Sequence, residues 1–359
     1  EAKFLTDVAQ EFFGSAEWFN LFHCVVVHYI DVNMATDAAS DCRGVFMIIM
    51  SEVLLALVNT IVKYVHQWST QKMMVVRNSV DFCLCLAMCI IFKFGVPGWK
   101  LAGLCILRGI VYIAFIVFLW ASLHSCLPMG DVVTTVVTFS PLFLVMLTRV
   151  LLGEKIPKEW PLQFLLCGTG AFLINKPMAP DRSCPLITSC LPLLAAFAGA
   201  LMNLATRNVK TMPPPVLNVF NDVVAVVYAV VSTVMKGESS TSILPKEIDG
   251  SLGLLILAGM IGWAGLLCNI KGYQSVSVAA IAGIAAYASV PLGYIIQVTV
   301  FGEELDLWSA AGAALIVCTN VTVIISKHLA ARREAAENEQ QKYKLLSDEA
   351  GVVDEAAGA

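Results

Sequence analysis

Charged residues are scarce in this sequence. They make up 14% of its 359 residues, whereas soluble globular domains contain about 25%. The charges that are present nearly cancel, because the formal net charge is only -4. The chain therefore lacks the large basic surface that binding to nucleic acid requires. This composition argues against a soluble globular protein and predicts that nucleic acid is not a partner.

Recognisable catalytic motifs are also lacking. The five histidines are scattered, and none belongs to an HExxH motif or accompanies a GxSxG nucleophile. Cys83, Cys85 and Cys89 stand close together, but Asp81 is the only acid near them and no histidine has a zinc-ligand spacing. We therefore predict that the protein is not an enzyme, needs no cofactor and holds no metal.

Hydrophobic residues, by contrast, make up 58% of the chain, and the mean hydropathy is +0.77. They gather in runs of about 20 residues, each long enough to cross roughly 30 Å of hydrocarbon as a helix. With Gly, Pro and charge clusters taken as breaks, the pattern predicts an all-α polytopic membrane protein with ten transmembrane helices. These helices are expected at residues 44–66, 73–93, 99–121, 128–151, 159–176, 185–206, 214–235, 250–270, 274–301 and 307–327.

Lys and Arg are unevenly distributed between the two sides of the predicted bundle. Ten crossings put both termini on one side, and the loops on that side carry most of the basic residues, for example Arg43 and Arg207. The positive-inside rule places this side in the cytosol. Near helix ends on the opposite side, an oxidising lumen would permit a disulfide among Cys126, Cys184 and Cys190. The sequence leaves open whether the membrane is the plasma membrane or an endomembrane.

The two ends of the chain differ from its apolar middle. Residues 1–43 form an N-terminal lead whose short apolar stretch cannot span a membrane and lacks the features of a signal peptide. Met34 opens a polar segment directly before the first long apolar run, so residues 1–33 are candidates for non-native read-through. After about residue 328 the chain becomes charged, and residues 328–359 are predicted to form a cytosolic tail.

The ten predicted helices divide into two similar sets of five, at residues 44–176 and 185–327. Each set contains a Ser and a Pro, an apolar stretch, a Gly-Glu pair and a further apolar helix. The Gly-Glu pairs begin at Gly153 and Gly302, 149 positions apart. Because five is odd, the second set enters the membrane from the opposite side. The pattern therefore predicts two inverted repeats, which typically expose a site near the membrane midplane alternately to each face.

The segment LRGIVYIAFIVFLWASLHSCLPMGDVVTTVVTFSPLFLVMLTRVLLGEKIP from Leu107 and the later segment FGEELDLW resemble the drug/metabolite transporter superfamily. Within it, the chain is similar to EamA-type transporters and most of all to subfamily G of solute carrier family 35. The resemblance covers residues 44–328 and is weaker in the second half, where Ala280 matches Asp131. It implies ten helices around a central cavity, with the fifth and tenth at the periphery and two halves that rock.

The resemblance implies a secondary transporter that moves a small organic metabolite by alternating access. Two alternatives stay open: an antiporter of nucleotide sugars or phosphorylated sugars in an internal membrane, and a membrane scaffold that does not transport. FYNN and GALNK motifs, typical of nucleotide-sugar transporters, are not evident. The excess of cationic side chains among the cavity candidates of the first half favours an anionic or zwitterionic solute. Substrate identity, coupling ion and direction are not predicted.

Two opposite charges lie deep in predicted helices. Arg108 lies about 13 Å from the nearest helix end, at a rise of 1.5 Å per residue, so its side chain cannot easily reach the surface. Glu52 lies at a similar depth, on the same helical stripe as Asn59 and Lys63. All four are candidates for lining the cavity. Glu52 and Arg108 are interpreted either as an ion pair that serves helix packing or as groups that bind substrate or a proton.

Further polar residues complete the candidate site. Arg77 and Asp81 are four positions apart on the second predicted helix, which suggests either a local ion pair or part of a gating network. Hydroxyl groups in membrane helices often bond only their own backbone, so a role in the cavity and a local role are both open. The remaining candidates are hydroxyl and amide side chains near the two repeat prolines: Thr138, Tyr287, Tyr294 and Gln297.

A run of small residues, AAGAA at 310–314, permits close approach of another helix. It predicts either a homodimer seam or internal packing. The expected partners are therefore a small-molecule solute, the lipid bilayer and, under the first interpretation, a second copy of the chain.

Overall fold

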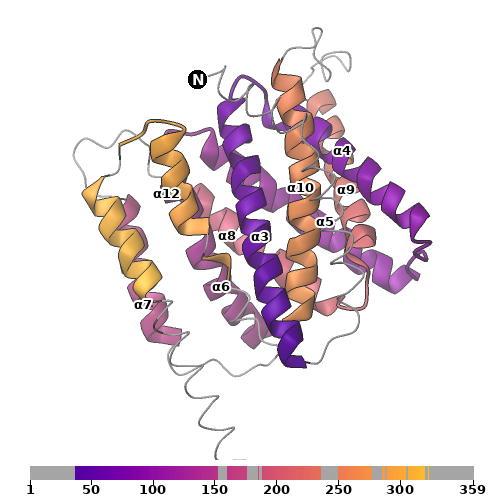
Figure 1. Cartoon of the computed structure of the whole chain (residues 1–359), viewed down its shortest axis with the longest axis horizontal. Coiled ribbons are helices and arrows are strands. Elements are labelled where there is room, and N and C mark those ends of the chain that lie inside the picture. Colours follow the sequence, from indigo (N-terminus) through magenta and orange to yellow (C-terminus); the bar gives the residue numbers. More distant parts are fainter. Residues whose placement is uncertain are drawn as a thin grey trace, which may run out of the picture.

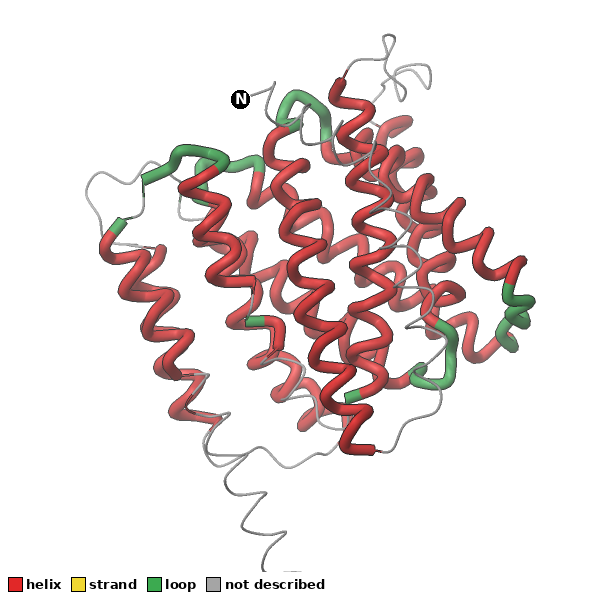
Figure 2. Tube along the Cα trace, in the orientation of Figure 1, coloured by secondary structure: helices red, strands yellow, loops and turns green. Residues whose placement is uncertain are grey.

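The computed structural model describes residues 37–152, 160–175, 185, 188–235, 250–276, 285–287, 289–304, 306–319 and 322. Over these residues the protein is helical throughout and contains no strand (Figure 2). The prediction of an all-α protein is confirmed for this part of the chain. The long apolar runs form helices because a helix satisfies its own backbone hydrogen bonds in an environment without water.

Seven helices in the described part of the chain are long and apolar enough to cross a membrane. Together they make the protein an integral, multi-pass membrane protein. They are α3 (Asp37–Tyr64), α4 (Thr70–Ile91), α5 (Trp99–Leu123), α6 (Met129–Leu152), α8 (Leu191–Asn208, after the 3-10 turn η2 at Thr188–Cys190), α9 (Pro214–Met235) and α10 (Gly250–Ser275). Shorter helices follow the same pattern at α7 (Trp160–Asn175), α12 (Ser289–Thr299) and Leu307–Thr319.

Most predicted boundaries agree with these helices to within a few residues, but the ninth predicted span differs. The region expected as one helix over 274–301 begins inside α10, which continues to Ser275. It is also interrupted at Tyr287, which forms a turn before α12 begins at Ser289. The physical reason is Pro291, whose ring excludes a helical carbonyl four residues earlier and which donates no hydrogen bond. The first helix also begins at Asp37, ahead of the predicted residue 44.

Helices from the two halves of the chain pack against one another throughout the bundle (Figure 1). α3 lies along α10, α4 along α9, and α6 along α12. α8 packs against both α5 and α6. The centre of the bundle is therefore enclosed by first-half and second-half helices together.

α7 and the helix Leu307–Thr319 lie side by side at one edge of the bundle (Figure 1). Their approach is very close, because a Cβ atom placed on Gly312 would come within 2.5 Å of the Gly170 carbonyl oxygen. Gly312 and Ala313 are buried, whereas Ala311 and Ala314 are exposed. The buried side of the predicted small-residue run therefore serves internal packing. A homodimer through the exposed side stays a prediction.

Candidate substrate cavity

A cavity lies in the middle of the bundle and is lined by α3, α4, α5, α6, α8 and α10, together with Ala286 before α12 and Ser289 at its start. Most of its wall is apolar, including Phe115 and Trp120 of α5. An apolar pocket with a few converging polar groups is typical of small-molecule sites. The polar groups that line it are Glu52, Asn59, Arg77, Tyr112, Ser140, Asn203, Asn269, Tyr273 and Ser289.

Arg77 supplies the positive charge of the cavity and is held rigidly from three sides. Its Nη1 donates to the Tyr112 hydroxyl at 2.5 Å and to Asn78 Oδ1 at 3.1 Å. Its Cζ atom lies 5.8 Å from the centre of the Trp120 ring, within cation–π range. A Cβ atom on Gly262 would come within 2.7 Å of Nη2, so only glycine leaves room for the guanidinium. The rigid side chain is suited to bind an anionic group by its planar donors.

Glu52 of α3 supplies the negative charge of the cavity. It lies within hydrogen-bonding reach of Ser289 and near the Tyr273 ring. The same wall contains Asn269, whose amide donates to Ser51 Oγ at 3.4 Å. Glu52 is partly accessible from the cavity. A carboxylate in this position is suited to bind a cationic group of a solute.

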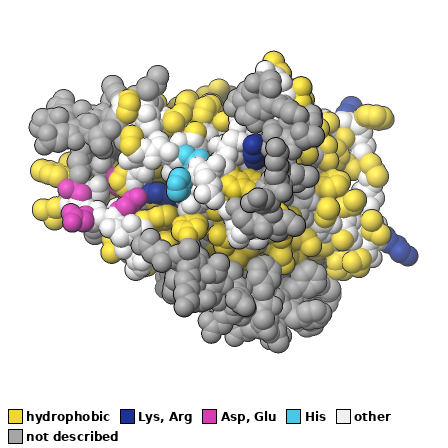
Figure 3. Space-filling model, turned by 90° about the horizontal axis from the view of Figure 1, so that it is seen from above, with side chains coloured by type: hydrophobic (Ala, Val, Ile, Leu, Met, Phe, Trp, Pro, Cys, Tyr) yellow, Lys and Arg dark blue, Asp and Glu magenta, His cyan; other side chains and the backbone are white. Residues whose placement is uncertain are grey.

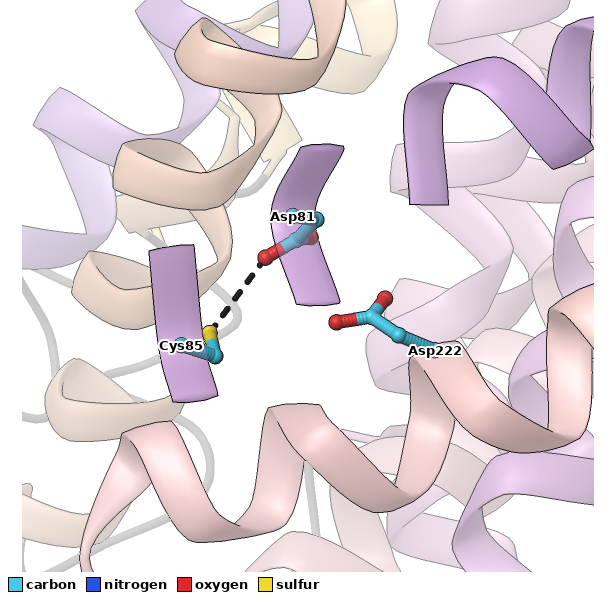
Figure 4. A group of neighbouring side chains, drawn as sticks. All are labelled: Asp81, Cys85 and Asp222. Carbon is cyan, nitrogen blue, oxygen red and sulfur yellow. Dashed lines mark hydrogen bonds between the residues drawn. The ribbon is translucent and has the colours of Figure 1, made fainter. Parts of the chain in front are cut away.

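Next to the cavity, four charged side chains are buried between α4, α5 and α9: Arg77, Asp81, Arg108 and Asp222, which we call the inner cluster. None of them is more than 1% exposed. Asp222 lies within electrostatic reach of the other three. Among the described residues, however, the inner cluster contains no ion pair within 4.0 Å. Asp81, Cys85 and Asp222 could supply ligands to a metal ion, because one donor atom of each lies within 4.8 Å of the others (Figure 4).

Arg108 does not form the ion pair with Glu52 that the sequence suggested. Its Nε donates to Thr206 Oγ1 at 2.7 Å, and both Nη atoms are buried without a hydrogen-bond partner in the described structure. Glu52 instead faces the cavity. The local ion pair of Arg77 and Asp81, one of the two interpretations of their spacing, does not form either, because the Arg77 guanidinium bonds Tyr112 on α5.

At the other end of the bundle, first-half and second-half residues meet directly. Lys63 Nζ forms an ion pair with Glu303 Oε1 at 2.6 Å and lies 4.8 Å from the centre of the Phe301 ring. Figure 3 looks onto this end, where a basic side chain is visible beside acidic ones. Lys63 therefore connects α3 to the segment that follows α12 rather than lining the cavity.

Two further bonds join α6 to α12 at the same end. The Gly130 amide donates to Gln297 Oε1 at 3.0 Å, and the Tyr294 hydroxyl donates to Asp131 Oδ1 at 3.2 Å. Together with the pair of Lys63 and Glu303, we call these the end contacts. Deeper in the bundle, the hydroxyl of Tyr287, in the turn before α12, donates to the Thr138 carbonyl of α6 at 3.4 Å.

The structure thus divides the predicted candidates into three groups. Glu52, Asn59 and Arg77 line the cavity. Asp81 and Arg108 belong to the inner cluster, and the remaining candidates join helices. Sequence reasoning did not name the aromatic residues Tyr112, Trp120 and Tyr273 as cavity residues. One signal was present for Tyr112, which lies one helical turn beyond Arg108 on the same face of α5.

The three cysteines expected near the non-cytosolic side differ in state. Cys126 is disulfide-bonded, Cys190 keeps its thiol, and Cys184 lies outside the described residues. A disulfide at this end of the bundle agrees with the expected oxidising compartment.

The chain matches 28 chains from solved structures. One of them, described as "Crystal structure of protein", has a TM-score of 0.59 and 16% identity over 82% of this chain and 99% of its own. This likeness shows a shared fold. No curated protein matches the chain, so the closer resemblance to subfamily G of solute carrier family 35 finds no support and stays a prediction.

The EamA-like transporter family matches residues 42–176. The matched region begins just before the membrane span of α3 and ends after α7, so it covers the five helices expected as the first repeat. It includes both charged residues of the cavity wall, Glu52 and Arg77. The match relates residues 42–176 to a family of membrane transporters.

Proposed function

We propose that the protein is a secondary transporter for a small organic solute. The observation that carries this proposal is the cavity in the middle of the bundle, which is lined by both halves of the chain. The EamA-like match supports it for the first half. A cavity between two halves can open to either side of the membrane when the halves rock against each other.

Two inverted five-helix repeats would account for the way the helices pack. In such repeats, α4 corresponds to α9 and α6 to α12, and each of these pairs is in contact. In the same correspondence, α3 matches α8 and α10 matches α5. The contact of α3 with α10 should therefore be mirrored by the contact of α8 with α5, and both contacts are extensive. These exchanges are what a pseudo-two-fold axis in the membrane plane produces. They support alternating access around the cavity.

The cavity wall favours a zwitterionic solute. Arg77 offers a fixed cation for a carboxylate, Glu52 offers an anion for an ammonium group, and Trp120 offers an aromatic face. Arg77 is the only cationic side chain among the described residues that line this cavity. Nucleoside-diphosphate sugars carry two phosphate charges, for which a single cation gives poor compensation. An amino-acid-like metabolite therefore fits the wall better.

Two observations support the proposed orientation, with the α4–α5 turn in the cytosol. Basic residues are concentrated on that side of the bundle. The disulfide-bonded Cys126 lies in the α5–α6 turn, at the opposite end. Reducing conditions in the cytosol disfavour disulfides, so this end should face a lumen or the exterior.

The test is uptake by the purified full chain in proteoliposomes. The panel contains zwitterionic amino acids, purines and nucleotide sugars, each with and without a pH gradient. We expect uptake of a zwitterion, and a loss of about tenfold or more in Arg77→Gln and in Glu52→Gln, equivalent to about 1.4 kcal/mol of binding free energy. Arg207→Gln is the matched control, because Arg207 lies in the last turn of α8 and does not line the cavity.

The other outcomes separate the alternatives. Uptake of nucleotide sugars alone would favour the antiporter, and no uptake across the panel would favour a scaffold without transport. Unchanged zwitterion uptake in Arg77→Gln and Glu52→Gln would show that the cavity wall does not bind the solute.

A further inference from the structure

The crossing of α4 and α9 brings two carboxylates together in the interior of the bundle. Donor atoms of Asp81, Cys85 and Asp222 all lie within 4.8 Å of one another, and the three side chains are buried. Figure 4 shows the Asp222 carboxylate directed toward the space between Asp81 and Cys85. The sequence gives no sign of this group, because Asp222 is 141 positions beyond Asp81.

The two carboxylates differ in how they are bonded. Asp81 Oδ1 accepts the Asn218 amide at 2.9 Å and the Cys85 thiol at 3.4 Å. Asp81 Oδ2 and both oxygens of Asp222 have no hydrogen-bond partner in the described structure, although Asp222 is 0% exposed. An ionised carboxylate without donors or solvent is strongly destabilised. Asp81 is thus prepared to carry a charge, whereas Asp222 is not.

The sum of the buried charges also favours an uncharged Asp222. The inner cluster and the cavity wall contain three carboxylates, Glu52, Asp81 and Asp222, and two guanidinium groups, Arg77 and Arg108. If all were ionised, this part of the described interior would carry one excess negative charge, which a low-dielectric environment disfavours. Asp222 lies on α9, and the groups that act on it electrostatically lie on two neighbouring helices. They are Arg77 and Asp81 on α4 and Arg108 on α5. Cys85 and Tyr112, on the same two helices, are also in reach.

We propose that Asp81 and Asp222 together bind one proton. A proton from water joins one Asp222 oxygen and forms an O–H bond, and this O–H donates to the unpartnered Asp81 Oδ2. The repulsion between two close carboxylates is thereby replaced by a hydrogen bond, as in other carboxylate pairs that share a proton. The proton also removes the excess negative charge.

A proton fits this position better than a divalent metal ion. The Asn218 amide already points its N–H group at Asp81 Oδ1 and lies 3.7 Å from the Cys85 sulfur, where it would oppose a cation. Arg77 and Arg108 add two positive charges within electrostatic reach of Asp222. Arg77 also lines the cavity. Solute and proton binding should therefore influence each other; this coupling rests on the proposed function, whereas proton binding itself does not.

The test is infrared spectroscopy of the purified full chain in lipid nanodiscs at neutral pH. We expect a carbonyl band of a buried, protonated carboxyl group that shifts in D2O. Asp222→Asn should abolish this band and still give a monodisperse protein, because the amide resembles the neutral acid. Cys85→Ser and Asp131→Asn are the matched controls and should keep the band, since neither removes a member of the pair.

Several results would overturn the proposal. Survival of the band in Asp222→Asn would do so, as would its loss in Glu52→Gln, which would place the proton in the cavity. A zinc ion retained stoichiometrically by the wild-type chain and lost in Cys85→Ser would show a metal site instead. If Asp222→Asn fails to assemble, Asp81→Asn takes its place: it removes the acceptor of the proposed hydrogen bond, so the band should shift or vanish, and an unchanged band would overturn the proposal. These spectra do not depend on transport, so their outcome is independent of the uptake experiment.

Discussion

The end contacts and the inner cluster both join the two halves of the chain, but they treat polar groups in opposite ways. At the end contacts, Lys63 meets Glu303 directly, and Gln297 accepts the Gly130 amide. In the inner cluster, Arg108 and Asp222 attract each other but leave both Nη atoms and both carboxylate oxygens without partners in the described structure. Among the described residues, Glu303 Oε2 is also buried without a partner, but opposite charges touch at the end contacts, whereas those of the inner cluster stay more than 4.0 Å apart.

This difference indicates different roles. The ion pair of Lys63 and Glu303 is partly exposed, and such a pair contributes modestly to stability and can break at small cost. Buried polar atoms without partners are rare in native proteins and call for an explanation such as bound water, a ligand or a proton. The inner cluster is therefore expected to be more sensitive to the loss of a charge than the end contacts.

The largest effect is expected when the inner cluster loses one cation. Arg108→Met should destabilise the protein by about 3–5 kcal/mol, because it leaves the buried negative charge of the Asp81 and Asp222 pair with less compensation. Thermal unfolding in detergent measures this change, with the reactivity of the buried cysteine thiols as the readout. Arg207→Met is the control and should have little effect.

The double variant Arg108→Met/Asp222→Asn sharpens this test. Because the proposed proton leaves Asp222 uncharged and the amide resembles the neutral acid, the second change should recover little of the lost stability. A double variant about as stable as the wild type would show that Asp222 is ionised and compensated by Arg108.

An intermediate effect is expected where the inner cluster meets the cavity. Gly262→Ala would place a Cβ atom within 2.7 Å of Arg77 Nη2 and displace the guanidinium. We expect a loss of about 1–3 kcal/mol from overpacking, together with a loss of uptake. Gly253→Ala on the same helix is the matched control, because a Cβ atom there meets nothing within 4 Å. Equal behaviour of the two variants in unfolding and uptake would contradict the role given to Gly262.

A smaller effect is expected at the end contacts. The side chains of Lys63 and Glu303 are 13% and 32% exposed, so solvent weakens their attraction. A double-mutant cycle with Lys63→Gln and Glu303→Gln should give a coupling of about 0.5–1 kcal/mol in thermal unfolding. The swapped variant Lys63→Glu/Glu303→Lys should recover part of it. A coupling as large as that in the inner cluster would erase the contrast between the two regions.

The smallest effect is expected at the edge of the bundle. Ala311→Leu changes an exposed residue next to the buried Gly312, so unfolding should change by less than about 0.5 kcal/mol. The molecular mass in detergent, measured by light scattering, should also stay the same. A change in that mass would show that the exposed side of the small-residue run forms an interface between copies.

Individual residues show how far the sequence could predict the site. Glu52 was named as a candidate from its depth in an apolar helix, Asn59 from its place on the same helical stripe, and Arg77 from its spacing with Asp81; all three line the cavity. The partners of these residues were not predictable in the same way. Arg77 was expected to pair with Asp81 four positions away, but it bonds Tyr112 on another helix, and Asp81 bonds Asn218 on a third.

The two prolines related by the repeat illustrate the same limit. Pro141 lies inside a continuous α6, whereas Pro291 stands in the first turn of α12, directly after a break at Tyr287. Both prolines remove one backbone donor. Whether the helix continues depends on the contacts that surround it, and these differ between the two halves.

The sequence by itself determined that this protein crosses the membrane many times as helices, and roughly where each helix begins and ends. Length, hydropathy and helix breakers are properties of a single segment, so they can be evaluated segment by segment. Only the tertiary structure decided that Asp222 meets Asp81, that Lys63 meets Glu303 and that Gly262 makes room for Arg77. Each of these contacts joins helices far apart in the chain, and their relative rotation and distance result from the packing of the whole bundle.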